Sequence, residues 1–184
     1  MAEYPRLEGL LRAVNPRSPN AGFTNKIVPY LVDVWMDDYA RTSRKAEIVE
    51  TTVSGFSYLF DLNPDRLRLI AAWGISMGRH GEPRDKARMR GHPLSDAKLR
   101  DRGHAIAHSL GGPCDINLVP QLLKINRGPF QKLERNAVAT PGSLYFTYWT
   151  YAKNGPAGQT PAGVEQGLLI AGHSPQITIA PHGN

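Results

Sequence analysis

The stretch that decides the fold runs Asp101-Arg102-Gly103-His104-Ala105-Ile106-Ala107-His108-Ser109-Leu110-Gly111-Gly112. It is followed by Asp115-Ile116-Asn117-Leu118-Val119-Pro120-Gln121, then Asn126-Arg127-Gly128, then Leu133-Glu134. The two glycines before Pro113 predict a chain reversal, and the short apolar run after it predicts a return strand. An amphipathic helix is expected to begin near Asn126. The order strand, turn, strand, helix would bring His104 opposite Asn126.

Outward from this stretch, the sequence predicts helices before it and strands after it. Apolar residues at helical spacing predict helices over 5–13, 25–39 and 44–60. A fourth helix is expected from Asn63, which can cap it, with Pro64 at its first position and Leu67, Ile70 and Trp73 buried. Residues 81–100 read as an exposed loop, and strands are expected over 144–151, 164–171 and 176–180.

Length and charge limit the class of protein. The 184 residues suit one domain, or one domain with an appendage, and 41% hydrophobic content is ordinary for a globular chain. The net charge is +6, and residues 79–135 hold twelve Lys/Arg against six Asp/Glu, while the rest is balanced at ten each. The whole positive excess therefore lies around the histidines, where it would attract a polyanion such as nucleic acid. A solvated basic loop without a partner remains the alternative.

The remaining sequence features exclude several classes. The single cysteine, Cys114, rules out an internal disulfide framework and a multi-cysteine zinc site. No apolar run is long enough to cross a bilayer. The first twelve residues are charged and lack an apolar core, so no signal peptide is expected and the chain should be cytoplasmic as synthesised. Any export would then need a specialised secretion system.

These motifs also carry a family resemblance. The series DRGH, NLVPQ, N-R-G and L-E resembles the DNA/RNA non-specific endonucleases, and in particular their bacterial toxin-type branch. The likeness covers roughly residues 100–140 and continues weakly to Tyr151 and Thr160-Pro161. It implies an α+β fold with a ββα-metal (His-Me finger) nuclease core, a helical N-terminal extension over 1–88 and a C-terminal antiparallel β segment within 89–184, although the whole could form one compact domain.

The resemblance also implies residue roles. His104 would be the general base that deprotonates a water, and Asn126 the direct metal ligand through its side-chain oxygen. Glu134, eight residues later and about two helical turns away, would support the hydrated ion from the same face. Asn117 would fix the strand pair. Asp101, like Asn117, is expected to support the site residues rather than to contact the metal or the substrate. A zinc site built on His104 and His108 is disfavoured, because no glutamate follows His104.

The chemistry explains why these residue types are wanted. Imidazole can accept a proton from water near neutral pH. Mg²⁺, with Mn²⁺ as an alternative, keeps several waters and needs few protein ligands, so one amide oxygen is a plausible anchor. An arginine would stabilise the negative charge on the scissile phosphate. We assign Arg102 to catalysis and Arg127, Arg135 and His108 to substrate binding; further arginine candidates upstream are Arg79 and Arg90.

The sequence thus predicts a metal-dependent, non-specific endonuclease that hydrolyses DNA, RNA or both. Contact with backbone phosphates rather than bases would leave the nucleotide sequence unread. An antibacterial toxin, neutralised by a cognate immunity protein, is the expected setting. Two alternatives remain open: a site-specific nuclease built on the same core, and a catalytically silent, basic nucleic-acid-binding module.

Overall fold

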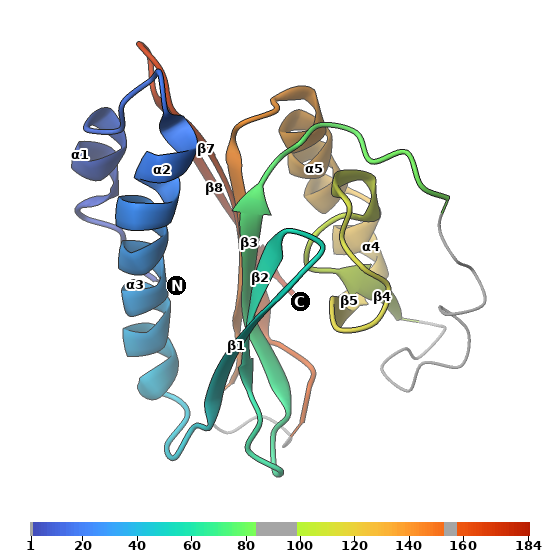
Figure 1. Ribbon diagram of the computed structural model, residues 1–184. Coiled ribbons are helices and arrows are strands. Elements are labelled where there is room, and N and C mark those ends of the chain that lie inside the picture. The colour runs from blue at the N-terminus through green and yellow to red at the C-terminus, as the bar shows by residue number, and fades with distance from the viewer. Residues whose placement is uncertain (1, 84–98, 153–157) are drawn as a thin grey trace.

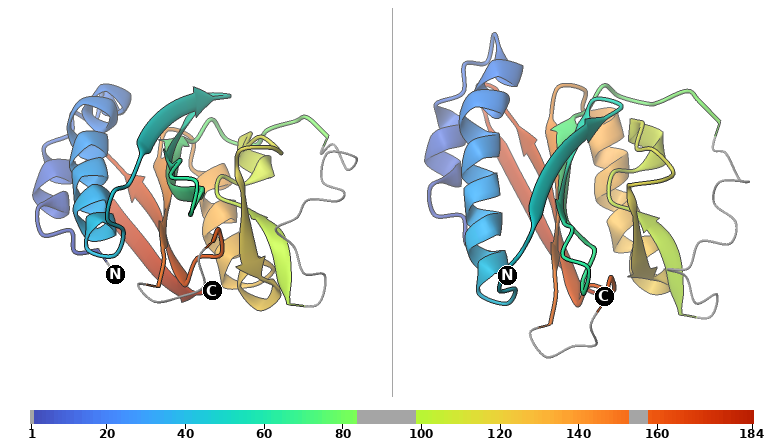
Figure 2. Two further views of the ribbon diagram at one scale, coloured as in Figure 1. Left: turned by 90° about the horizontal axis from the view of Figure 1, so that it is seen from below. Right: turned by 60° about the horizontal axis from the view of Figure 1, so that its bottom comes forward.

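A six-stranded antiparallel sheet forms the middle layer of the protein (Figure 1). The computed structural model describes residues 2–83, 99–152 and 158–184. In spatial order the strands are β1 (Ile48–Val53), β2 (Phe56–Asp61), β3 (Arg68–Ile75), β6 (Leu144–Thr150), β7 (Gly163–Ile170) and β8 (Gln176–Gly183). The last three confirm the strands predicted in the C-terminal part. Helices from the first 40 residues cover one face of the sheet, and elements from residues 100–139 cover the other (Figure 2).

The helical layer packs on the sheet through aromatic side chains. It contains α1 (Leu7–Arg12), α2 (Pro19–Gly22), a π-helical turn η1 (Phe23–Ile27) and α3 (Val28–Ala40). Pro29 lies in the first turn of α3, directly after the π-helical turn η1. Trp35 of α3 is fully buried and stacks on Tyr148 of β6 with ring centroids 5.9 Å apart. The helices predicted over 5–13 and 25–39 are confirmed.

The two further helices predicted in this half are wrong, because residues 48–75 form strands. Ser54 and Gly55 both have positive φ, 54° and 80°, and make the tight turn between β1 and β2. The apolar spacing of 44–60 fits a helix and a strand equally, and its β-branched residues settle it as a strand. Asn63 accepts the Asp65 N–H in a turn rather than capping a helix, and Leu67 is 48% exposed.

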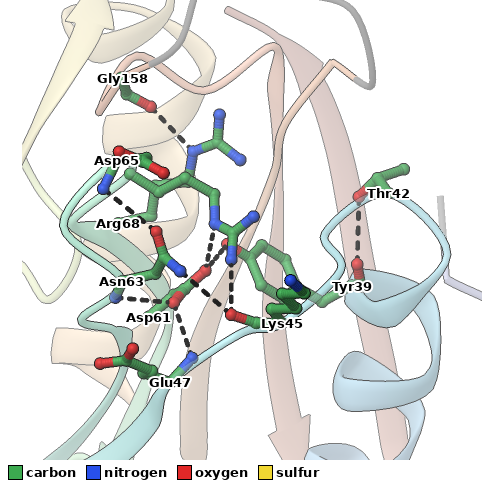
Figure 3. A network of polar contacts seen from close by, with 10 residues as sticks. Tyr39, Thr42, Lys45, Glu47, Asp61, Asn63, Asp65, Arg68 and Gly158 are labelled. Atoms are coloured by element: carbon green, nitrogen blue, oxygen red, sulfur yellow. Dashed lines mark hydrogen bonds and ion pairs between the residues drawn. The ribbon is translucent and has the colours of Figure 1, made fainter.

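A polar network fastens this turn to α3 (Figure 3). The Asp61 carboxylate is fully buried and accepts hydrogen bonds from the Tyr39 hydroxyl (2.8 Å), the Arg66 Nε (2.7 Å) and the backbone N–H groups of Glu47 and Asn63. Burial alone would raise the pKa of Asp61, but these four donors hold it below its usual value. The network is therefore a stabilising joint that depends on an ionised carboxylate.

Residues 76–143, here termed the insert, leave and re-enter the sheet at one place. Ile75 ends β3 and its register partner is Leu144, the first residue of β6. Within the insert lie a two-stranded ribbon of β4 (Arg100–His104) and β5 (Leu118–Leu122), the short 3-10 turn η2 (His108–Leu110), α4 (Leu123–Asn126) and α5 (Pro129–Ala139). The predicted order of strand, turn, strand and helix is confirmed, and the α+β class with it.

The predicted division into residues 1–88 and 89–184 stays a prediction. Its boundary lies among residues 84–98, outside the described residues, as does most of the expected loop over 81–100. The six-stranded sheet takes β1 to β3 from one side of that boundary and β6 to β8 from the other. In the described part of the chain, no helix has the length and apolar character needed to cross a membrane.

Candidate active site

The β4–β5 ribbon and the loop between its strands form the base of the site. The strands pair antiparallel, with His104 opposite Leu118 and Gly103 opposite Val119. A Cβ on Gly103 would collide with the buried Gln121 side chain of β5, so glycine allows the two strands to approach. The residue before His104 is therefore fixed by packing, and His104 lies at the last position of β4.

Asn117 holds the loop that follows His104. Its side chain is fully buried and accepts the Ile106 N–H (2.7 Å), while its Nδ2 donates to the carbonyl oxygens of Ile106 (2.6 Å) and Pro113 (3.1 Å). The Asn117 carbonyl oxygen also accepts the Ala105 N–H. A Cβ on Gly112 would collide with the Ile106 carbonyl oxygen, so the loop closes on glycine at that point. These contacts are those expected of a residue that fixes the strand pair.

A cavity of about 680 Å³ opens between β4, η2, α5 and the segment after β3. Most of the predicted site residues meet in it: His104, His108, Arg102, Asn126, Glu134 and Arg135. Polar and charged side chains dominate its wall, which suits an anionic ligand. The described residues that line it are Arg79, His80, Glu82, Arg102, His104, Ala107, His108, Ser109, Asn126, Gln131, Glu134, Arg135, Val138 and Ala139.

His104 lies deepest among the cavity histidines, with only 6% of its surface exposed. Its ring centroid is 6.3 Å from that of His108, which is half-buried at the start of η2. Ala105, Ile106 and Ala107, the residues after His104, belong to the hydrophobic core. The imidazole is therefore held by a rigid backbone while it faces a polar cavity, as a proton-transferring group requires.

Asn126 ends α4, and Asp101 orients its amide. The Asn126 Nδ2 donates to the Asp101 carboxylate (3.0 Å). The side-chain oxygen of Asn126 is thus the amide atom left for a ligand in the cavity. The pKa of Asp101 is held below its usual value, mainly by hydrogen bonds from Arg127 and, against the effect of burial, from Asn126. Asp101 therefore stays ionised and keeps the amide in one orientation.

Arg127 is placed differently from the other predicted arginines. Its guanidinium makes two hydrogen bonds of 2.8 Å to Asp101, and its side chain is 66% exposed. Arg127 is not one of the described residues that line the cavity. Substrate contact by Arg127 stays a prediction, and the structure gives it the separate contact with Asp101.

Glu134 and Asn126 reach the same cavity by a route other than a continuous helix. The helix is interrupted between α4 and α5 at Gly128, where a Cβ would clash with the Lys124 carbonyl oxygen. The assumption of two unbroken helical turns was therefore wrong, although both side chains line the cavity. Arg102 on β4 and Arg135 on α5 line it as well, so two cations flank these oxygen donors.

Two residues could not be identified from the sequence, one in the cavity and one that supports β5. His80 had no supporting pattern, yet it lines the cavity, and its ring meets that of His108 edge-on at 5.9 Å and 85°. Asn184 donates through Nδ2 to the carbonyl oxygens of Pro120 (2.8 Å) and Pro161 (3.0 Å) and accepts the Leu122 N–H, which ties β5 to the main sheet. Only the three-dimensional structure brings such distant segments together.

Of the other candidates, one lies in the cavity wall. Arg79 lines the cavity beside His80, whereas Arg90 lies outside the described residues. The buried Cys114 is absent from the cavity lining, as are His173 and His182 among the described histidines. In the described part of the chain, no group of three or more His, Cys, Asp or Glu side chains could hold a metal ion.

The chain is similar to known proteins in sequence and in fold. The family model for DNA/RNA non-specific endonucleases matches residues 73–142. None of the curated proteins matches the chain. A crystal structure of the EndoG/EndoGI complex matches with a TM-score of 0.52 at 14% identity, covering 82% of this chain and 80% of that chain.

NucA from Streptococcus agalactiae matches in its metal-free and magnesium-bound crystal structures, each with a TM-score of 0.46 at 14% identity. These matches cover 82% and 81% of this chain and 89% and 90% of NucA. The match to the EndoG/EndoGI complex, together with the family model, shows the fold of the ββα-metal nucleases. The segment 73–142, which contains every described residue of the cavity wall, is similar to the DNA/RNA non-specific endonuclease family.

Proposed function

We propose that this protein is a metal-dependent endonuclease that hydrolyses phosphodiester bonds of DNA, RNA or both. The observation that carries the proposal is the meeting of His104 and Asn126 in one cavity, from the end of β4 and the end of α4. The match of residues 73–142 to the DNA/RNA non-specific endonuclease family supports the same substrate class. The positive excess of residues 79–135 would favour the approach of a polyanion.

His104 is proposed as the general base. Its imidazole would take a proton from a water molecule aligned with the phosphorus of a bound phosphodiester. Because His104 is buried at the end of β4, the ring would not need to be ordered at each turnover. Arg102 and Arg135 would stabilise the negative charge that grows on the phosphate oxygens in the transition state.

The oxygen donors in the cavity fit Mg²⁺, or Mn²⁺ in its place. Asn126 would ligate the ion through its side-chain oxygen, because Asp101 occupies the amide nitrogen. Glu134 would hold water molecules of the hydrated ion from the same cavity wall. When bound, such an ion would withdraw charge from the phosphate and from the leaving oxygen.

The lack of sequence preference is proposed from the character of the cavity wall. It contains arginine, histidine, carboxylate and amide groups, but no Trp, Tyr or Phe among its described residues. Arginine and histidine donors suit phosphate oxygens, whereas aromatic side chains would provide stacking surfaces for bases. A substrate held mainly by its backbone can be cleaved at many sequences.

The test is cleavage of supercoiled plasmid DNA and of a structured RNA, with Mg²⁺ or with EDTA. Wild type should degrade at least one substrate only with the ion, and His104→Ala should lose about 10²- to 10⁴-fold in rate. His173→Ala is the matched control, because His173 is an exposed histidine outside the cavity lining. Circular dichroism confirms that each variant is folded.

The same assay separates the alternatives. A protein that binds nucleic acid without metal and never cuts it would be a binding module. Cleavage restricted to one sequence or structure would indicate a specific nuclease. Equal cutting by wild type and His104→Ala would remove His104 from the mechanism.

The metal ligand needs its own measurement. Asn126→Ala should raise the Mg²⁺ concentration required for half-maximal cleavage, while Asn126→Asp, which keeps an oxygen donor, should shift it less. Isothermal titration with Mg²⁺ checks binding without relying on activity. An unchanged metal requirement in Asn126→Ala would assign the ion to other groups.

A narrower proposal concerns the biological setting. The wording of the motif, R-G-H-x-x-A-H-x-x-G-G in this chain, supports a bacterial toxin that would require a cognate immunity protein. Induced expression of wild type in bacteria should then stop growth, whereas His104→Ala should be tolerated. Normal growth with active wild-type enzyme present would contradict the toxin role and leave the nuclease activity standing.

A further inference from the structure

His80 and His108 form a pair on the open side of the cavity, built from two segments far apart in sequence. The His80 backbone N–H donates to the Ser109 carbonyl oxygen (2.8 Å), which docks the segment after β3 onto η2. A second contact joins the His108 Nε2 to the Glu82 carbonyl oxygen at 3.1 Å. The two rings then pack edge-on, 5.9 Å apart. These three contacts bring together two histidines that are far apart in the sequence.

The geometry leaves one nitrogen of His80 for a ligand. A Cβ on Gly111 would lie 3.6 Å from the His80 Nδ1, so that nitrogen faces the η2 turn. Nε2, at the other end of the ring, therefore faces away from the turn. His108 is constrained differently: a carbonyl oxygen only accepts, so the His108 Nε2 must carry a hydrogen and is occupied by Glu82.

The pair differs from His104 in depth. His104 is 6% exposed, whereas His80 is exposed and His108 half-buried. His108 touches both other rings, at 5.9 Å and 6.3 Å, and so lies between the outer and the inner histidine. A phosphate bound at His104 and a phosphate bound at His80 would therefore lie on either side of His108.

The surrounding charge favours an anion at this position. Arg79 is exposed beside His80 and lines the same cavity, as do Arg102 and Arg135. The opposing carboxylates of the described wall are Glu82 and Glu134, so cations exceed acids. A phosphodiester strand with one phosphate at His104 would pass this cationic rim on its way out of the cavity.

We propose that His80 donates a hydrogen bond from Nε2 to the phosphate next to the scissile one, and that His108 is the positioning residue that holds its ring. This inference rests on the proposed function and extends it, because it makes the preferred substrate a polynucleotide rather than an isolated phosphodiester. His104 acts on the scissile group, and the outer pair binds the strand beyond it.

The test compares substrates with and without a flanking phosphate. The substrates are bis(p-nitrophenyl) phosphate, a single diester, and a short oligonucleotide. In His80→Ala the ratio of oligonucleotide to small-diester kcat/KM should fall about five- to tenfold, mostly through KM. His80→Gln, which retains an N–H donor, should recover most of this loss, and His173→Ala should behave as wild type. Binding of a labelled oligonucleotide in EDTA should weaken in His80→Ala by a similar factor.

The outcomes separate this inference from the proposed function. An equal fall on both substrates, or no fall on either, would overturn the flanking subsite while His104→Ala still reports on catalysis. A kcat loss without a KM change would assign His80 to the chemistry and also contradict the inference. If His104→Ala cleaves both substrates at the wild-type rate, the proposed function fails whatever His80 does.

Discussion

The insert and the six-stranded sheet divide the tasks of the molecule. Every described residue of the cavity wall lies between Arg79 and Ala139, inside the insert. The sheet contributes no side chain to that wall, although it carries most of the large buried aromatic residues. The family match, residues 73–142, follows the insert almost from end to end. Chemistry is thus concentrated in one stretch of sequence, while the support comes from strands far apart.

The difference predicts that stability and activity respond separately in the two regions. In the sheet, a substitution should lower the free energy of unfolding and leave the rate of the folded enzyme nearly intact. In the insert, the same loss of stability should be accompanied by a loss of activity, because loop and site are one structure. Four predictions break or sharpen this contrast.

The largest effect is expected at the joint between α3 and β2. Asp61→Ala removes a buried acceptor of four hydrogen bonds and should lower the free energy of unfolding by about 3 kcal/mol. Urea unfolding measures it, and the cleavage rate of the folded fraction should stay within about twofold of wild type. Asp65→Ala, an exposed carboxylate in the same turn, is the control. A collapse of activity at full folding would refute the separation.

Asn117 is the corresponding residue in the insert. Asn117→Ala removes three side-chain hydrogen bonds from the loop after His104 and should cost about 2 kcal/mol. Because the loop orients His104 and His108, the cleavage rate should fall at least tenfold even at temperatures where the variant is folded. If Asn117→Ala lowers stability but keeps its activity, the loop only supports the fold. Asn117→Ala and Asp61→Ala would then have the same effect on activity, which would contradict the prediction.

A smaller effect should appear in acid. The folded-state pKa of Asp61 is lowered, so its contribution to stability is complete above the unfolded value, about 3.9, and is lost as pH falls toward the folded pKa. Wild type should therefore lose stability as the pH drops below about 4, and Asp61→Asn should show a shallower slope there. Thermal unfolding at several pH values checks this, with Asp65→Asn as the comparison. Parallel slopes in all three proteins would contradict it.

The smallest effect belongs to the tie between the two regions. Asn184→Ala removes the side-chain hydrogen bonds that join β5 to the main sheet and should cost about 1 kcal/mol, because the residue is only part-buried. Hydrogen exchange should show faster opening of β5 than of β6 or β7. Uniform protection across the three strands would show that the ribbon is held by other contacts.

The same division explains what the sequence could predict. In the insert, turn glycines, strand residues and the helix start follow one another within forty residues, so local rules were enough for β4, β5 and α5. Residues 48–75 were wrongly predicted because their apolar spacing fits either a helix or a strand. Their β-branched residues and the pairing of β1 with β2, of β2 with β3 and of β3 with the distant β6 favour strands. His80 and Asn184 were invisible for a related reason: their contacts, to Ser109 and to Pro120, exist only once separate segments have packed.

The pairing of Ile75 with Leu144 has a consequence for how such a protein can be altered by recombination. Topologically the insert is a long excursion from a β-hairpin, so both of its ends could be joined to the same two strand ends in a related scaffold. It is not a detachable module, however, because Phe130 of α5 covers Trp149 of β6, and the Gln166 side chain bonds the Phe130 carbonyl oxygen. A replacement insert must bring its own helix to cover the sheet. Exchange should succeed only when the loop after His104 and α5 are transferred together.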